Sequence, residues 1–155
     1  METFYILDTC SLYSYCNRYL NIFQNRRISL NEGSLRKLKS AFYSKSIKII
    51  LPGIIFVEIF DHYSSDKEII NKFRYEFYLP LITDEDTNIY ISGIDSEVLD
   101  NLPLCYTDDT SIDLHDKIIL ATSLKYSDKN TLLFTSDERI KKIKRKNNLN
   151  ITIQS

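Results

Sequence analysis

The chain has 155 residues, 43% of them hydrophobic and 26% charged, with only three glycines and three prolines. This balance predicts one globular domain over residues 1–155 and excludes disordered, collagen-like and linker-rich sequences. The formal net charge is −1, but acids and bases are distributed unevenly along the chain. Their positions therefore carry more information than their sum.

Three further features indicate the compartment. Residues 1–8 contain no basic leader and reach a carboxylate after one short apolar run, so they do not predict a secretory signal. The longest apolar stretch elsewhere, residues 49–57, is about half as long as a membrane span needs. The cysteines at positions 10, 16 and 105 form neither a CxxC pair nor a disulfide framework. We therefore expect a soluble cytoplasmic protein that spans no membrane.

Hydrophobic periodicity in the first half of the chain predicts two buried strands separated and followed by helices. Pro52 ends the second strand and suits the first turn of the next helix. In chain order we expect a strand at Thr3–Leu7, helices at about 11–23 and, after a turn at 31–34, about 35–42, a strand at 47–51, and helices at 54–63 and about 67–77.

The second half continues the alternation. We expect a strand at 88–91, a short helix capped by Asp95, a loop at 106–111, a helix at 113–125 capped by Ser111 or Asp113, a strand at 131–135, a helix at 137–146 and an edge strand at 151–153. Several strands are apolar on both faces, which is typical of parallel sheets. The fold class predicted is α/β: a three-layer sandwich with a mainly parallel four- to five-stranded central sheet flanked by helices.

The charges form two blocks. Residues 81–116 contain ten acids and no lysine or arginine, whereas residues 139–146 contain six bases and no acid. Most of these side chains are expected on solvated surfaces, but a basic helix beside carboxylates also suits the binding of a polyanion near metal ions. The candidate phosphate-binding residues are Arg139, Lys141, Lys142, Lys144, Arg145 and Lys146.

Four carboxylates occupy positions that stability alone would give to other residues. Asp8 and Asp137 follow two predicted strands, at the edge where open α/β sheets bind ligands. Glu58 and Asp116 lie three or four residues from isoleucines on their predicted helices, so each projects from an apolar face. Burial of an ionised carboxylate without a partner is strongly destabilising. Each must be protonated, paired with a base or bound to a cation.

A divalent cation explains the four acids together better than four separate ion pairs. Only two bases, Lys117 and Arg139, are close to these segments in the sequence. Oxygen ligands specify Mg²⁺ or Mn²⁺ rather than zinc. His62 and His115 make no familiar zinc spacing with the cysteines. Mg²⁺ or Mn²⁺ is therefore the expected cofactor.

Four segments together resemble the PIN-domain ribonucleases, especially the single-domain toxins of toxin–antitoxin pairs. A strand ends in Asp-Thr, a proline precedes a helix with a glutamate, a helix opens with an aspartate, and a last strand ends in Thr-x-Asp. Their order and spacing agree from residue 3 to about 140. The segments are 5–9 (YILDT), 51–58 (LPGIIFVE), 114–124 (LHDKIILATSL) and 132–137 (LLFTSD).

The resemblance implies a metal-dependent ribonuclease with an RNA substrate and, for a toxin, a small antitoxin partner and a homodimer. The metal would activate a water, so no protein nucleophile is required. Thr9 and Thr135 would orient ligands or, equally, make turn and cap bonds. Asp113 is either a helix cap or an outer carboxylate. The residues implied to hold the metal are Asp8, Glu58, Asp116 and Asp137.

Two alternatives stay open at this point. Many family members have a further acid two residues after the Thr-x-Asp aspartate, where this chain has Arg139. That departure puts a second metal site in doubt and allows a PIN-like module that has lost catalysis and acts in RNA binding or assembly. A haloacid-dehalogenase-like phosphatase is less well supported, because it needs an acid two residues after Asp8 and Cys10 stands there.

Overall fold

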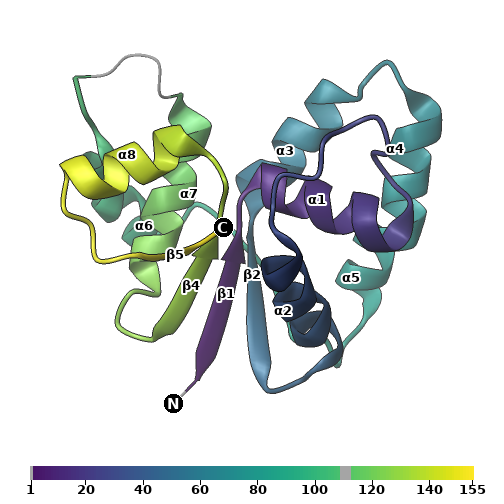
Figure 1. Cartoon of the computed structure of the whole chain (residues 1–155), viewed down its shortest axis with the longest axis horizontal. Helices are drawn as coiled ribbons and strands as arrows, with labels where there is room; N and C mark the ends of the chain where they lie inside the picture. Colours follow the sequence, from purple (N-terminus) through teal and green to yellow (C-terminus); the bar gives the residue numbers. More distant parts are fainter. Residues whose placement is uncertain (1, 109–112) are drawn as a thin grey trace.

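A computed structural model describes residues 2–108 and 113–155 and places a parallel sheet at the centre of the molecule (Figure 1). The sheet has five strands in the order β3-β2-β1-β4-β5. Every strand pair in it is parallel, which extends the prediction of a mainly parallel sheet. The strands are β1 (Thr3–Leu7), β2 (Ile47–Pro52), β3 (Ile89–Ser92), β4 (Asn130–Phe134) and β5 (Thr152–Gln154).

The central strands are buried on both faces, as their apolar sequences predict. Tyr5 of β1 lies opposite Ile49 of β2 and Leu132 of β4. The next residue, Ile6, is fully buried and lies between Ile50 and Leu133. This register brings β1, β2 and β4 to the same edge of the sheet at their carboxyl ends.

Helices cover both faces of the sheet in two groups (Figure 1). The connections that lead from β1 to β3 carry one group, and the connections that lead from β3 through β4 to β5 carry the other, as right-handed crossovers require. The first group is α1 (Thr9–Leu20), α2 (Glu32–Tyr43), α3 (Gly53–His62), α4 (Lys67–Phe73), a π-helical turn η1 (Arg74–Tyr78) and α5 (Leu79–Thr83). The second is α6 (Ser96–Asn101), a 3₁₀ turn η2 (Leu102–Cys105), α7 (Leu114–Lys125) and α8 (Glu138–Lys146).

Two predicted helices were wrong in extent. The helix expected at 11–23 is α1, which begins earlier because Asp8 caps it and ends at Leu20 because Asn21 adopts a left-handed conformation with φ 55°. The helix expected at 67–77 continues through η1 and α5 to Thr83. Pro80 is the second residue of α5, which follows the π-helical turn directly.

The remaining boundaries differ from the predictions by a few residues. Asp113 caps α7, whereas Ser111, the alternative cap, lies outside the described residues. Residues 109–111 of the predicted loop also lie outside them. None of the helices in the described part of the chain is long and apolar enough to cross a bilayer.

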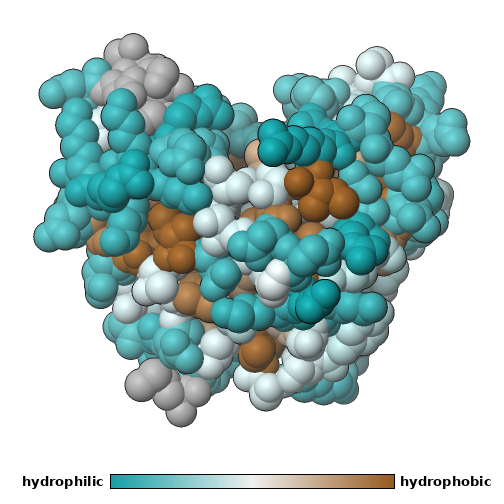
Figure 2. Space-filling view, in the orientation of Figure 1, coloured by the Kyte–Doolittle hydropathy of each residue, from teal (hydrophilic) through white to brown (hydrophobic). Residues whose placement is uncertain are grey.

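Successive strands are added to the sheet on one side of β1 as far as β3 and then on its other side from β4, so the strand order reverses between β1 and β4. These strands are neighbours, but α1 leaves β1 toward one face and α8 leaves β4 toward the other (Figure 1). Open α/β sheets bind ligands at the carboxyl ends of strands at such a point. The surface is hollowed there, between the half with α1 and α3 and the half with α7 and α8 (Figure 2).

Candidate active site at the carboxyl edge of the sheet

Asp8 is the most deeply buried of the four acids, with 2% of its surface exposed. It follows β1 and caps α1, since its Oδ1 accepts a hydrogen bond of 2.8 Å from the backbone N of Ser11. Its Oδ2 accepts a hydrogen bond from the Thr135 hydroxyl. Burial raises the pKa of Asp8, these donors lower it, and the negative charge on Asp137 raises it further.

Thr135 connects Asp8 to Asp137. Its hydroxyl donates to Asp8 and accepts a hydrogen bond of 3.0 Å from the backbone N of Asp137. Asp137 caps α8 through the backbone N of Arg139, 2.9 Å from Oδ1. The Arg139 side chain turns back onto the same carboxylate, with Nη2 3.3 Å from Oδ2. The acid after β4 therefore has a basic partner from its own helix.

Glu58 joins three helices. It projects from α3, and its Oε2 accepts a hydrogen bond of 2.8 Å from the Thr9 hydroxyl at the start of α1. Its Oε1 lies 2.8 Å from Nδ1 of His115 on α7. The Glu58 side chain is 25% exposed, so the carboxylate stays accessible from the hollow. Thr9 follows Asp8 in the chain, so the contacts of Glu58 lie beside those of Asp8.

Asp116 is the acid whose environment leaves it unsatisfied. It is 8% exposed, and its buried Oδ2 has no hydrogen-bond partner among the residues that the structure describes. Burial raises the pKa of Asp116 to about 7, with further contributions from the negative charges of Asp113, Asp137 and Glu58. Arg139 opposes this shift. Near neutral pH the group takes up a proton or needs a cation.

The four carboxylates lie close enough to act on one another. The charge on Asp137 raises the pKa of both Asp8 and Asp116, and Glu58 contributes to the shift at Asp116. A fixed cluster of negative charge repels itself unless a proton or cation intervenes. The bases near the acids are few: Arg139 contacts Asp137, whereas Lys117 lies over the ring of Tyr106, 4.5 Å from its centroid.

The donor set is one of carboxylate oxygens, which is the chemistry that Mg²⁺ and Mn²⁺ prefer. The unpaired Oδ2 of Asp116 fits a cation ligand in this respect. Within residues 2–108 and 113–155, however, no three His, Cys, Asp or Glu side chains are already arranged to hold one ion. The arrangement is thus a collection of suitable ligands, two of which, Glu58 and Asp137, are engaged by His115 and Arg139.

The six bases predicted to bind phosphate lie in different surroundings along α8. Arg139 faces Asp137, whereas three others line a separate cavity of about 440 Å³ beside β5. Among these, Lys141 also donates to Glu138. The cavity beside β5 is lined by Lys141, Lys144 and Arg145; Lys142 and Lys146 are exposed on α8.

Sequence reasoning did not assign two residues that shape this edge. The backbone amide of Ser11 donates to Oδ1 of Asp8, the residue that caps α1. The Ser11 hydroxyl donates to the backbone O of Phe134, 2.6 Å away. Its position three residues after Asp8 is the signal that a helix cap leaves in a sequence. His115 was considered only as a zinc ligand, and its contact with Glu58 has no local signal because the two are far apart in the chain.

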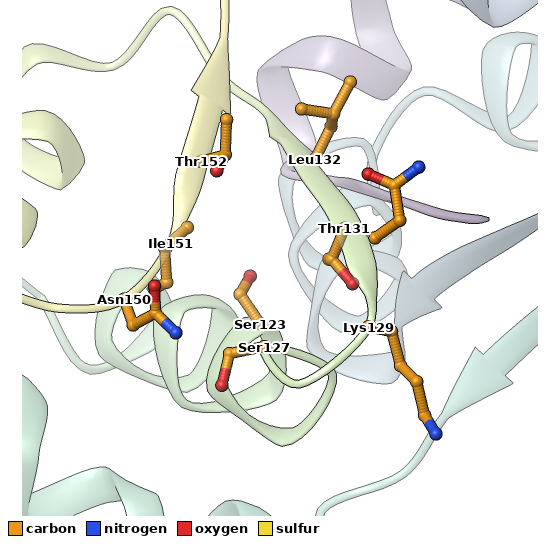
Figure 3. Close-up of a pocket in the computed structure, with 9 residues that line it drawn as sticks. Ser123, Ser127, Lys129, Thr131, Leu132, Asn150, Ile151 and Thr152 are labelled. Carbon is orange, nitrogen blue, oxygen red and sulfur yellow. The ribbon is translucent and has the colours of Figure 1, made fainter. Parts of the chain in front are cut away.

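A cavity of about 530 Å³ lies at this edge, between the start of α1, α3 and the start of α7. Its lining includes Thr9, Glu58 and His115. Figure 3 shows a smaller cavity of about 250 Å³, where β4 and β5 begin and α7 ends. None of the described residues that line that second cavity carries a carboxylate. None of the four candidate acids therefore lines that second cavity.

No protein-family profile and no curated protein sequence matches the chain. Among solved structures, the chain is similar to VapBC2 from Rickettsia felis, a structure bound to a DNA fragment from its promoter. The TM-score is 0.59 at 17% identity, and the match covers 97% of each chain. The likeness confirms the predicted fold class, a PIN-like sandwich with a central parallel sheet flanked by helices.

Proposed function

We propose that this protein is a ribonuclease that uses Mg²⁺ or Mn²⁺ to hydrolyse RNA phosphodiester bonds at the edge formed by Asp8, Glu58, Asp116 and Asp137. The observation that carries the proposal is the buried Oδ2 of Asp116, which has no partner in the described chain and lies beside other acids. A divalent cation satisfies that oxygen and neutralises its neighbours at the same time.

Such a cation, when bound, lowers the pKa of a water and stabilises negative charge on the attacked phosphate. The chain's own residues prepare the ligands. The Thr135 hydroxyl and the Ser11 amide hold the two oxygens of Asp8, and the Thr9 hydroxyl holds Oε2 of Glu58. Hydrolysis that breaks the bond between phosphorus and O3′ leaves a 5′-phosphate and a 3′-hydroxyl, as the resemblance to PIN-domain ribonucleases implies.

A bound cation would compete with contacts that this chain already makes. To hold it, Glu58 and Asp137 would give up their contacts with His115 and Arg139. In the pair formed by Arg139 and Asp137, 53% of the Arg139 side chain and 16% of the Asp137 side chain are exposed. Ion pairs near the surface contribute little to stability, about 1 kcal/mol or less, so the loss of this pair has a small cost.

The contact between Arg139 and Asp137 also supports a second candidate, a PIN-like module that binds RNA or assembles with a partner without cleaving it. In that case Arg139 is the permanent counter-ion of Asp137. The two candidates differ in one measurable property, since only the enzyme cleaves RNA in the presence of a divalent metal.

The deciding experiment incubates the protein with single-stranded RNA in Mg²⁺, Mn²⁺ or EDTA. We expect cleavage with either metal and none in EDTA. Asp8→Asn and Asp116→Asn each lower the rate by about 100-fold or more, because each removes a negatively charged ligand. Asp100→Asn is the matched control, since Asp100 is an exposed acid on α6 and its loss leaves the rate unchanged.

Two outcomes of this assay would overturn the proposal of an enzyme. Inertness of the folded wild type in both metals overturns the enzyme and favours the RNA-binding module. Equal rates for Asp8→Asn and the wild type also overturn it, because a contaminating nuclease then accounts for the cleavage. Circular dichroism of each variant confirms that the fold is retained.

On the resemblance and the shared fold we further propose that the chain is the toxin of a toxin–antitoxin pair, with a small antitoxin that covers the acidic edge. Expression of the chain alone in a bacterial host then stops growth, and expression of Asp8→Asn does not. Growth that is unaffected by the wild-type chain at matched expression contradicts the toxin assignment and leaves the nuclease test unchanged.

A further inference from the structure

Arg26 lies in the connection between α1 and α2, which runs back across α1 toward the hollow (Figure 1). This connection is firmly held. The side chains of Ile22 and Phe23 are each 1% exposed. The backbone O of Arg26 accepts a hydrogen bond of 2.7 Å from Nδ2 of Asn17, and its N donates to the O of Phe23, 2.9 Å away. The backbone of Arg26 is therefore fixed to the core.

Two tyrosines hold the Arg26 side chain as well. Its guanidinium carbon lies 4.0 Å from the centroid of the Tyr13 ring, in a cation–π contact. Its Nε donates a hydrogen bond of 2.6 Å to the hydroxyl of Tyr63. Tyr13 and Tyr63 are both buried and pack around Phe23, with ring centroids 4.8 and 5.0 Å from it. The guanidinium thus has a rigid aromatic support.

The fixed guanidinium has no carboxylate partner. Arg26 forms no ion pair with any acid in residues 2–108 or 113–155, although Glu58 and Asp61 line the same cavity. Its two Nη nitrogens make no hydrogen bond within that part of the chain. Two other arginines, Arg18 and Arg139, form ion pairs, with Glu32 and Asp137; Arg26 differs from both because two buried tyrosines hold its side chain. A guanidinium that is oriented in advance and has two free donors is suited to bind an anion with two oxygens.

We propose that Arg26 binds a backbone phosphate of single-stranded RNA and thereby places the adjoining phosphodiester bond at Glu58, which lines the same cavity. This inference rests on the proposed nuclease function and adds a substrate contact to it. The cavity that Arg26 shares with Glu58 and His115 has a volume of about 530 Å³, within the range of small-ligand sites. The acids in the cavity repel a phosphate, and Arg26 supplies the fixed positive charge that offsets this repulsion.

The test measures binding without catalysis. A fluorescein-labelled ten-nucleotide oligouridylate is titrated in EDTA at 50 to 200 mM KCl, and Kd is obtained from fluorescence anisotropy. We expect Arg26→Gln to raise Kd about tenfold and to reduce the slope of log Kd against log salt by about 0.7, the value for one phosphate contact on a single strand. Arg27→Gln is the matched control, because Arg27 is the next residue and is exposed; its Kd changes by less than about twofold.

Two further variants guard against a loss of structure. Arg26→Lys keeps the charge but loses the planar pair of donors, and Tyr63→Phe removes only the hydroxyl that orients Nε. Each should weaken binding about threefold while the urea midpoint stays close to that of the wild type. Unchanged binding by folded Tyr63→Phe and Arg26→Lys overturns the proposal, even if Arg26→Gln fails to fold.

The outcomes separate this site from the nuclease activity. Equal effects of Arg26→Gln and Arg27→Gln, or no binding by the wild type, overturn the Arg26 site, and the cleavage assay then stands by itself. If Arg26→Gln weakens binding selectively but the wild type cleaves no RNA in Mg²⁺ or Mn²⁺, the enzyme proposal fails and Arg26 remains an RNA contact.

Discussion

Asp8 and Asp116 are both buried carboxylates at the same edge of the sheet, but their surroundings differ. Asp8 receives hydrogen bonds from the Ser11 amide and the Thr135 hydroxyl, whereas Oδ2 of Asp116 receives none from the described residues. A buried polar atom without a partner is rare in folded proteins. The chain therefore supplies donors to both oxygens of Asp8, while Oδ2 of Asp116 needs a proton or a cation from outside.

The largest effect on stability is expected from a substitution of Asp116, the acid whose Oδ2 has no partner among the described residues. The pKa of Asp116 is raised from 3.8 to about 7, so the folded state holds a proton that the unfolded state has lost. The wild type therefore loses stability as the pH rises from about 4 to about 7, and Asp116→Asn does not. We expect the stability advantage of Asp116→Asn to grow by about 2 to 3 kcal/mol between pH 4.5 and pH 8.

Urea unfolding in EDTA at the two pH values measures this difference. Asp100→Asn serves as the control, because the exposed Asp100 has no comparable burial. An advantage of Asp116→Asn that is the same at both pH values would show that Asp116 has a partner in solution that satisfies its carboxylate.

An intermediate effect on the free energy of unfolding is expected at Asp8, the acid whose two oxygens accept hydrogen bonds. Thr135→Val removes the hydroxyl that donates to Asp8 and accepts from the Asp137 amide. Two polar groups at a buried site lose a partner, which lowers the free energy of unfolding by about 2 kcal/mol at pH 7. Thr83→Val, at the exposed end of α5, changes it by less than about 0.5 kcal/mol. If the two variants unfold at the same urea concentration, the Thr135 hydroxyl does not support Asp8.

The smallest effect concerns the pair formed by Arg139 and Asp137. The Arg139 side chain is 53% exposed, and exposed ion pairs contribute about 0 to 1 kcal/mol. We expect Arg139→Gln to change the free energy of unfolding by less than about 0.5 kcal/mol, as measured in urea at pH 7. A loss above about 1.5 kcal/mol would show that Arg139 is a structural counter-ion, which favours the non-catalytic module over the enzyme.

Local sequence signals predicted most of the fold. The strand at Thr3–Leu7 was confirmed, because a short run of β-formers ends at a capping aspartate. The continuation of the helix through Arg74–Tyr78 to Thr83 was not predicted. Phe73, just before that π-helical turn, packs against Phe23 and Phe56, with ring centroids 5.4 and 6.1 Å away, and these partners are distant in the sequence.

The sequence by itself determined which segments alternate as strands and helices, and it placed Asp8 and Asp137 directly after two strands of the sheet. Periodicity and capping act over a few residues, so they can be read from the chain. Only the tertiary structure decided which partner each acid has: Thr9 and His115 for Glu58, Thr135 for Asp8, and none in the described chain for Oδ2 of Asp116. These contacts join residues distant in the sequence, and only the packing of helices onto the sheet brings them together.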